Sequence, residues 1–142
     1  MEILSKYFGK TEISEETIIT MIQPVYGFEQ ADAYTILTDS ELGSDIMWFQ
    51  SIHHPEICFI LANPEAFALR KPEAFSQEVL TMLSVPSKED LDVAYLLSVT
   101  DTLEQATVNL KSPIVFNPHT RQGAQIILNE DLPLRERLFA SC

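Results

Sequence analysis

Short apolar runs, separated by polar turns, recur along the whole chain. The runs are rich in β-branched and aromatic residues, a pattern that is typical of β-strands. Residues 2–8 and 11–13 predict an opening hairpin with its turn at Gly9-Lys10. Further strands are predicted over residues 34–37, 46–52, 57–62, 93–100, 106–110, 113–116 and 124–129.

Helical patterns are few and short. Ser76 is a predicted cap for a helix that carries its apolar residues at positions 79–83 on one face and ends before Pro86. Residues 14–20 and the segment after Ser87 predict brief capped turns, because the β-branched residues after Ser14 disfavour a long helix.

The arrangement of the runs favours one fold class. Connections between the predicted strands are short, so hairpins are favoured over helical crossovers. Residues 57–62 and 94–99 are apolar without alternation, which predicts that both faces of these strands are covered. We therefore predict a mainly β chain: a compact single-domain antiparallel β-barrel-like fold over residues 1–142, with one or two short helices and a flexible last few residues.

Charge limits the partners of such a domain. At 142 residues and 46% hydrophobic content the chain can bury a core, yet its net charge is -12. Few Lys and Arg are available to neutralise phosphates, so direct binding of nucleic acid or an anionic membrane is not expected. Between Lys10 and Arg70 there is no Lys or Arg. This acidity either maintains solubility or forms a face that is complementary to a basic partner.

The chain lacks the common motifs of enzymes and secreted proteins. Its glycines are too far apart for a dinucleotide fingerprint or a phosphate loop. Cys58 lies in an apolar run and Cys142 is the last residue, so neither a disulfide nor a metal site is predicted. No signal peptide or membrane span is evident. We expect a cytoplasmic protein without a cofactor.

Histidines and amides are the remaining polar candidates. His53 and His54 are neighbours whose side chains point to opposite faces in an extended chain, so they do not predict a shared metal, and no serine has the flanking glycines of a nucleophile elbow. We predict no enzyme. Amides recur in or beside the apolar strands, where they either bond to the backbone or lie on a partner-binding surface. These amides are Gln50, Asn63, Asn109, Asn117 and Gln125.

Residues 106–128, ATVNLKSPIVFNPHTRQGAQIIL, resemble the signature of the FliW flagellar assembly factor family. The matching features are an Asn-Leu pair, a Pro-Ile-Val strand that ends in Asn, and a turn that leads to Gly-x-Gln. GFE (27–29), WFQS (48–51) and Asn-Pro (63–64) follow the expected order, whereas QPVY (23–26) departs from the Gly-Leu-Pro-like stretch common in the family. We expect structural roles for the motif residues Gly27, Gln50, Asn63, Asn109, Pro113, Asn117, Gly123 and Gln125.

The resemblance implies a non-enzymatic regulator, monomeric alone, that binds the RNA-binding repressor CsrA and flagellin and so couples flagellin synthesis to export. An acidic protein beside the basic surface of a repressor would repel RNA within a Debye length, roughly 8 Å. Candidate contacts to CsrA are the acids Glu29, Asp32 and Asp45, with Phe28 or Trp48 as apolar anchors. The alternative for both aromatic residues is core packing.

Flagellin would need an apolar groove or an exposed strand edge, which we expect around Asn109 to Asn117. A competing hypothesis from another class is a small-ligand-binding β-barrel or weak hydrolase. Its polar interior pocket would be lined by Asn109, Gln125 and His119.

Overall fold

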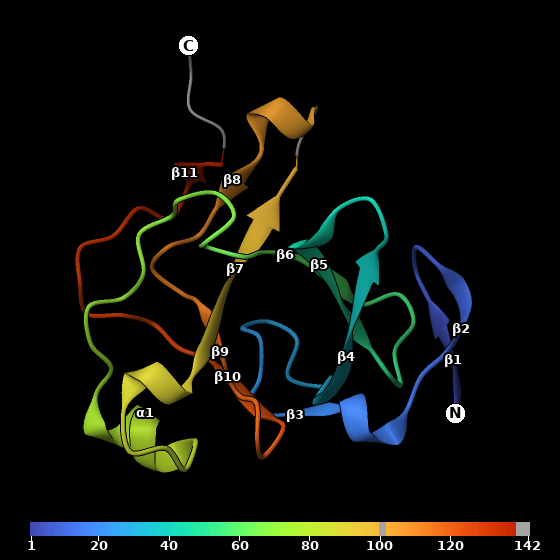
Figure 1. The fold of residues 1–142 in the computed structure, drawn as a ribbon, viewed down its shortest axis with the longest axis horizontal. Coiled ribbons are helices and arrows are strands. Elements are labelled where there is room, and N and C mark those ends of the chain that lie inside the picture. The colour runs from blue at the N-terminus through green and yellow to red at the C-terminus, as the bar shows by residue number, and fades with distance from the viewer. Residues whose placement is uncertain (100–101, 139–142) are drawn as a thin grey trace.

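The fold is a closed β-barrel, and the computed structural model describes residues 1–99 and 102–138 of it (Figure 1). Within these residues, seven strands pair in the order β7-β6-β5-β4-β3-β10-β9, and β9 pairs with β7 to close the ring. This confirms the predicted mainly β, barrel-like fold. The barrel strands are β3 (Ile19–Gln23), β4 (Ala33–Asp39), β5 (Gly43–Ser51), β6 (Cys58–Ala62), β7 (Asp92–Ser98), β9 (Ile114–Asn117) and β10 (Gln122–Gln125).

Strand β3 departs from the predictions in two ways. A capped turn was expected over residues 14–20, but only the 3-10 helix η1 (Glu15–Thr17) follows Ser14, and a strand begins at Ile19. In addition, β3 pairs in parallel with β10, with Thr20 opposite Gln122, whereas every other pairing among the described residues is antiparallel. Its short apolar run cannot reveal a partner that lies about a hundred residues away, so the sequence pattern missed this strand.

The last part of the chain is less regular than predicted. Strand β8 (Thr107–Val108) is shorter than the predicted 106–110, and β11 (Glu136–Arg137), which pairs with it, was not predicted. Strand β10 ends at Gln125 rather than at residue 129. The predictions for residue 100 and for flexible residues at 139–142 lie outside the described residues.

The barrel interior is filled by alternate residues of the strands. The rings of Tyr34 on β4 and Phe49 on β5 stack with centroids 4.1 Å apart, and Phe116 on β9 meets Phe49 edge-on at 5.6 Å. Leu61 and Ala94 belong to the same cluster. This layer is a packed aromatic and aliphatic core.

The outer face of β5 to β7 is covered as well, which explains the runs without alternation. Ala62 and Tyr95 pack into a second cluster, together with the C-terminal segment and α1 (Gln77–Met82). The predicted cap is confirmed, because the Ser76 hydroxyl accepts from the N–H of Val79. A further 3-10 turn is η2 (Lys88–Asp90), and η3 (Leu103–Gln105) precedes β8. No described helix is long and apolar enough to cross a membrane.

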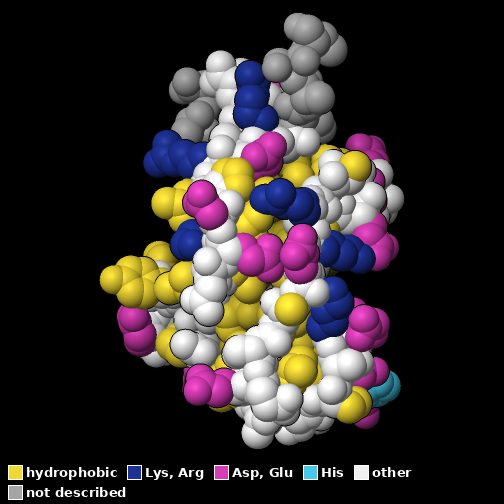
Figure 2. Space-filling model, turned by 90° about the vertical axis from the view of Figure 1, so that its left-hand side faces the viewer, with side chains coloured by type: hydrophobic (Ala, Val, Ile, Leu, Met, Phe, Trp, Pro, Cys, Tyr) yellow, Lys and Arg dark blue, Asp and Glu magenta, His cyan; other side chains and the backbone are white. Residues whose placement is uncertain are grey.

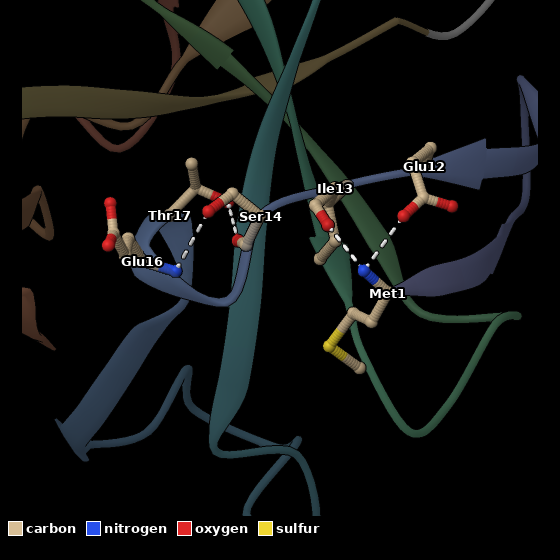
Figure 3. A network of polar contacts seen from close by, with 6 residues as sticks. All are labelled: Met1, Glu12, Ile13, Ser14, Glu16 and Thr17. Atoms are coloured by element: carbon tan, nitrogen blue, oxygen red, sulfur yellow. Dashed lines mark hydrogen bonds and ion pairs between the residues drawn. The ribbon is translucent and has the colours of Figure 1, made fainter.

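An N-terminal hairpin of β1 (Glu2–Ser5) and β2 (Gly9–Glu12) covers the outer face of β4 and β5. The Met1 ammonium donates to Glu12 Oε1 at 2.9 Å and to the Ile13 carbonyl at 2.8 Å (Figure 3). In the next turn the Ser14 hydroxyl accepts from the N–H of Glu16. These contacts hold the N-terminus against the end of β2 and order the turn that leads to β3.

Gln50 joins the hairpin to the barrel. This fully buried side chain accepts through Oε1 from the N–H of Lys6 at 2.9 Å and from the Ser5 hydroxyl at 3.2 Å. Its Nε2 donates to the carbonyls of Ser51 (3.1 Å), Pro55 (3.1 Å) and Ile57 (3.3 Å). Burying an amide side chain is costly unless its oxygen and nitrogen make hydrogen bonds, and both the Oε1 and the Nε2 of Gln50 do so.

Candidate partner-binding groove

The parallel strands β3 and β10 end side by side and then diverge, and a groove opens between them. After Gln23 the chain turns away into the loop that leads to β4, while residues 126–128 continue beside residues 111–113. The groove has a volume of about 580 Å³. Its lining includes Tyr26, Phe28, Phe59, Leu96, Gln125 and Ile127.

The floor of the groove is apolar and continuous with the barrel core. Phe59 and Leu96 pack against the interior cluster, and Phe28 meets Phe59 edge-on with centroids 4.9 Å apart. At the rim, the side chains of Tyr26 and Ile127 are 84% and 69% exposed. Large apolar side chains that gather around a hollow are typical of surfaces that bind another molecule.

The amides at the groove are engaged by backbone groups. Gln125 Oε1 accepts from the N–H of Tyr26 at 2.7 Å, and its Nε2 donates to the Ser112 carbonyl at 3.3 Å. Asn109 Oδ1 accepts from the N–H groups of Lys111 and Ser112. The third residue of the hypothetical polar pocket, His119, is not among the groove's lining residues. The structure therefore does not assemble that pocket.

Two predicted acids lie in the loop at this groove. Glu29 accepts from the N–H of Gly27, whose φ of +89° favours glycine. Glu29 and Asp32 are exposed, and among the described residues neither carboxylate makes an ion pair. Asp45 is also exposed, but it lies beside the far end of β4, about 20 Å from Asp32 at the usual rise per strand residue.

The two predicted aromatic anchors are also separated. Phe28 lines the groove, whereas Trp48 lies on the outer face of β5, half-buried against the hydrophobic cluster there. Trp48 packs edge-to-face against Phe8, with the ring centroids 5.3 Å apart. The structure thus brings Phe28 and Glu29 together in the lining of the groove, leaves Asp32 exposed at the end of the same loop, and places Trp48 elsewhere.

A second hollow of about 590 Å³ lies at the other end of the barrel interior, beside Ile36 and Met47. Two of its charged residues form an ion pair: Lys71 donates to Glu65 at 2.6 Å, and this hydrogen bond and charge lower the pKa of Glu65. On the side of the molecule that carries α1 and β11, basic and acidic side chains are interspersed (Figure 2). An acidic contact face is therefore not found there.

Other motif residues contact the backbone of their neighbours. A Cβ on Gly123 would lie 2.9 Å from Phe116 Cδ1 and 3.2 Å from the Val115 carbonyl oxygen, so β10 approaches β9 closely there. Asn117 Nδ2 donates to the Leu83 carbonyl at 2.7 Å and ties the barrel to α1. Asn63 Oδ1 accepts a hydrogen bond from the N–H of Glu65, two residues later in the turn. Pro113 is buried, and its carbonyl accepts from the N–H of Ile126.

Catalytic or metal chemistry gains no support from these geometries. The residues that the structure describes contain no group of three or more His, Cys, Asp or Glu that could hold a metal ion. Cys58 is partly buried, and burial raises its thiol pKa to about 11, so the nucleophilic thiolate is scarce near neutral pH.

Comparison with known families decides the relationship. The model of the FliW protein family matches residues 2–138. The chain belongs to the FliW family. The flagellar assembly factor FliW of Caldicellulosiruptor bescii is 33% identical over 140 residues, which cover 96% of this chain and 90% of that protein. The FliW of Caldanaerobacter subterraneus subsp. tengcongensis is 31% identical over 131 residues, covering 92% of this chain and 87% of that protein.

A solved FliW structure agrees with the fold. The crystal structure of a flagellar assembly factor FliW superposes with a TM-score of 0.89 at 30% identity and covers 99% of both chains. The resemblance of residues 106–128 to FliW proteins was therefore a correct prediction. Sequence reasoning missed the roles of Tyr26 and Ile127 at the groove, because their proximity depends on the unpredicted pairing of β3 with β10.

Proposed function

We propose that this FliW-family chain is a non-enzymatic, cytoplasmic regulator of flagellar assembly that acts by binding CsrA and flagellin. Its relatives are named flagellar assembly factors, which supports a role in this process. When flagellin accumulates, it occupies the chain and leaves CsrA free to repress flagellin translation. After flagellin is exported, the chain captures CsrA and relieves the repression.

The observation that carries this proposal is the apolar groove with unpaired acids on its loop. Tyr26 and Phe28 offer aromatic contact area, Glu29 supplies negative charge in the same groove, and Asp32 adds an exposed carboxylate three residues further along the loop. A repressor that binds RNA needs a basic surface. With a net charge of -12, a chain bound beside that surface would repel RNA over roughly 8 Å at physiological salt.

Flagellin is proposed to use the same region of the chain. Asn109 and Ser112, in the segment expected for flagellin, line the groove together with the residues proposed for CsrA. Because both partners would need the same groove, bound flagellin would exclude CsrA and bound CsrA would exclude flagellin. Release of flagellin would therefore allow CsrA to bind.

The test is retention of purified CsrA and purified flagellin by the immobilised chain, each competed with the other. We expect both to be retained and each to displace the other. Failure to retain either partner would contradict the proposed function.

Charge reversal separates the two ends of the barrel. Glu29→Lys with Asp32→Lys should slow CsrA association about tenfold at low salt and flatten its salt dependence, because rim charges act mainly on association. Glu41→Lys with Asp45→Lys is the matched comparison at the far end of β4, because it changes the net charge by the same amount. Equal effects of both changes would place the contact away from the groove, and unchanged rates would remove the electrostatic argument.

A further inference from the structure

One wall of the groove is the extended segment 126–128 that follows β10, and its edge towards the groove has no backbone partner among the described residues. The N–H groups of Ile126 and Leu128 donate to the carbonyls of Pro113 at 3.1 Å and Lys111 at 2.8 Å. Alternate residues of an extended chain direct their backbone groups to opposite sides, so the N–H and C=O of Ile127 face the groove. In the described part of the chain, no hydrogen bond reaches either group.

The loss of a partner at this point follows from the topology. Strand β3 covers the same edge of β10 as far as Gln23 and Ala124, and Pro24 then leads the chain away. One residue after Ala124, the side-chain Oε1 of Gln125 accepts a hydrogen bond from the N–H of Tyr26. The loop therefore bonds to a side chain here and does not pair with the backbone edge. An unpaired strand edge beside apolar side chains is a template for an incoming extended segment.

Charge indicates what kind of segment fits. Glu29 is the single charged residue among the residues that line the groove, and no cation of the described chain pairs with it. A Lys or Arg on the incoming segment would satisfy this carboxylate. Phe59 and Leu96 on the floor would accept an apolar side chain from the same segment.

We propose that the groove binds its partner by strand addition: an extended segment of the repressor pairs its backbone with Ile127, places an apolar side chain over Phe59 and Leu96, and directs a basic side chain to Glu29. This proposal rests on the proposed function, because the basic partner is the RNA-binding repressor. An amphipathic helix bonds its own backbone and would leave the edge at Ile127 unused.

Two substitutions at one position separate backbone pairing from side-chain contact. Ile127→Ala keeps the N–H and removes the apolar side chain, whereas Ile127→Pro removes the N–H as well. Proline is tolerated at an unpaired edge, so both variants should keep the thermal midpoint within a few degrees. We expect Ile127→Pro to bind purified CsrA about tenfold more weakly than Ile127→Ala. Equal affinities of the two variants would overturn strand addition.

Hydrogen exchange on the unmodified chain gives a second readout. Saturation with CsrA should slow amide exchange at Ile127 at least tenfold, because its N–H becomes bonded. Unchanged exchange at Ile127, with binding retained, overturns the docking mode and leaves the proposed function standing. Absence of CsrA binding overturns both, and protection by flagellin but not by CsrA overturns the choice of occupant.

The basic side chain has its own test. Glu29→Gln should weaken CsrA binding about threefold at low salt and have little effect at high salt, since the lost contact is an ion pair at the rim. Glu41→Gln, an exposed acid in the hairpin between β4 and β5, is the matched control. A Glu29→Gln variant that matches this control contradicts the assignment of Glu29.

Discussion

Gln50→Leu tests whether the hairpin is held to the barrel by hydrogen bonds or by apolar contact alone. Leucine matches glutamine closely in size, so the substitution removes polar groups while filling the same space. The N–H of Lys6 loses its partner at 2.9 Å, and the Pro55 carbonyl loses its donor at 3.1 Å. The Ile57 carbonyl is less affected, because it also accepts from the N–H of Ser51 at 3.0 Å.

The expected cost follows from these orphaned groups. The buried Ser5 hydroxyl also loses its acceptor, Gln50 Oε1. A buried polar group left without a partner destabilises by about 1–3 kcal/mol, so these three groups together predict a loss of about 3 kcal/mol after the gain from burying leucine. The entropy of unfolding for a chain of 142 residues is about 0.3 kcal/mol per kelvin at the midpoint. The thermal midpoint should therefore fall by about 10 °C.

Calorimetry and urea unfolding measure this loss directly. Gln30→Leu makes the same chemical change at an exposed loop position and should alter stability by no more than about 0.5 kcal/mol. A midpoint for Gln50→Leu within 3 °C of the parent chain, with an unchanged urea slope, would refute the reasoning. The buried amide would then contribute no net stability.

Three further substitutions and one labelling experiment probe the core. Gly123→Ala should destabilise by about 1–3 kcal/mol in urea unfolding, because its Cβ would overlap Phe116, and a neutral result would show that the strands separate easily. Tyr34→Phe should be neutral or stabilising, since its buried hydroxyl has no partner among the described residues. Tyr95→Phe should lower the free energy of unfolding by about 1 kcal/mol, because the Tyr95 hydroxyl donates to a backbone carbonyl. A larger loss of stability for Tyr34→Phe than for Tyr95→Phe would contradict these assignments. Alkylation of Cys58 in the folded chain, followed by mass spectrometry, should rise about tenfold per pH unit from pH 7 towards its raised pKa of about 11, and a plateau near pH 9 would contradict that pKa.

Local patterns in the sequence determined much of the barrel. The predicted strands at 34–37, 57–62 and 113–116 overlap β4, β6 and β9, because short apolar runs that are rich in β-branched and aromatic residues favour strands over helices. The cap at Ser76 was predictable since it uses an N–H only three residues away. Membership of the FliW family was likewise evident in the spacing of residues 106–128.

Pairings between distant strands were decided only by the tertiary structure. Nothing in residues 19–23 indicates a parallel partner at residues 122–125, because hydrogen bonds across a barrel depend on closure of the whole sheet. The same pairing creates the groove where the two strands diverge. The candidate site therefore combines predicted residues, Phe28 and Glu29, with unpredicted ones, Tyr26 and Ile127.

The net charge of -12 and the family follow from the order and kind of residues alone, since both are properties of the chain before it folds. The positions of the charged residues in space depend on the tertiary structure. Asp32 and Asp45 are thirteen positions apart in sequence, yet β4 separates them by about 20 Å, while Tyr26 and Gln125, ninety-nine positions apart, share a hydrogen bond. Strand length and barrel closure decide which residues can contact one partner together.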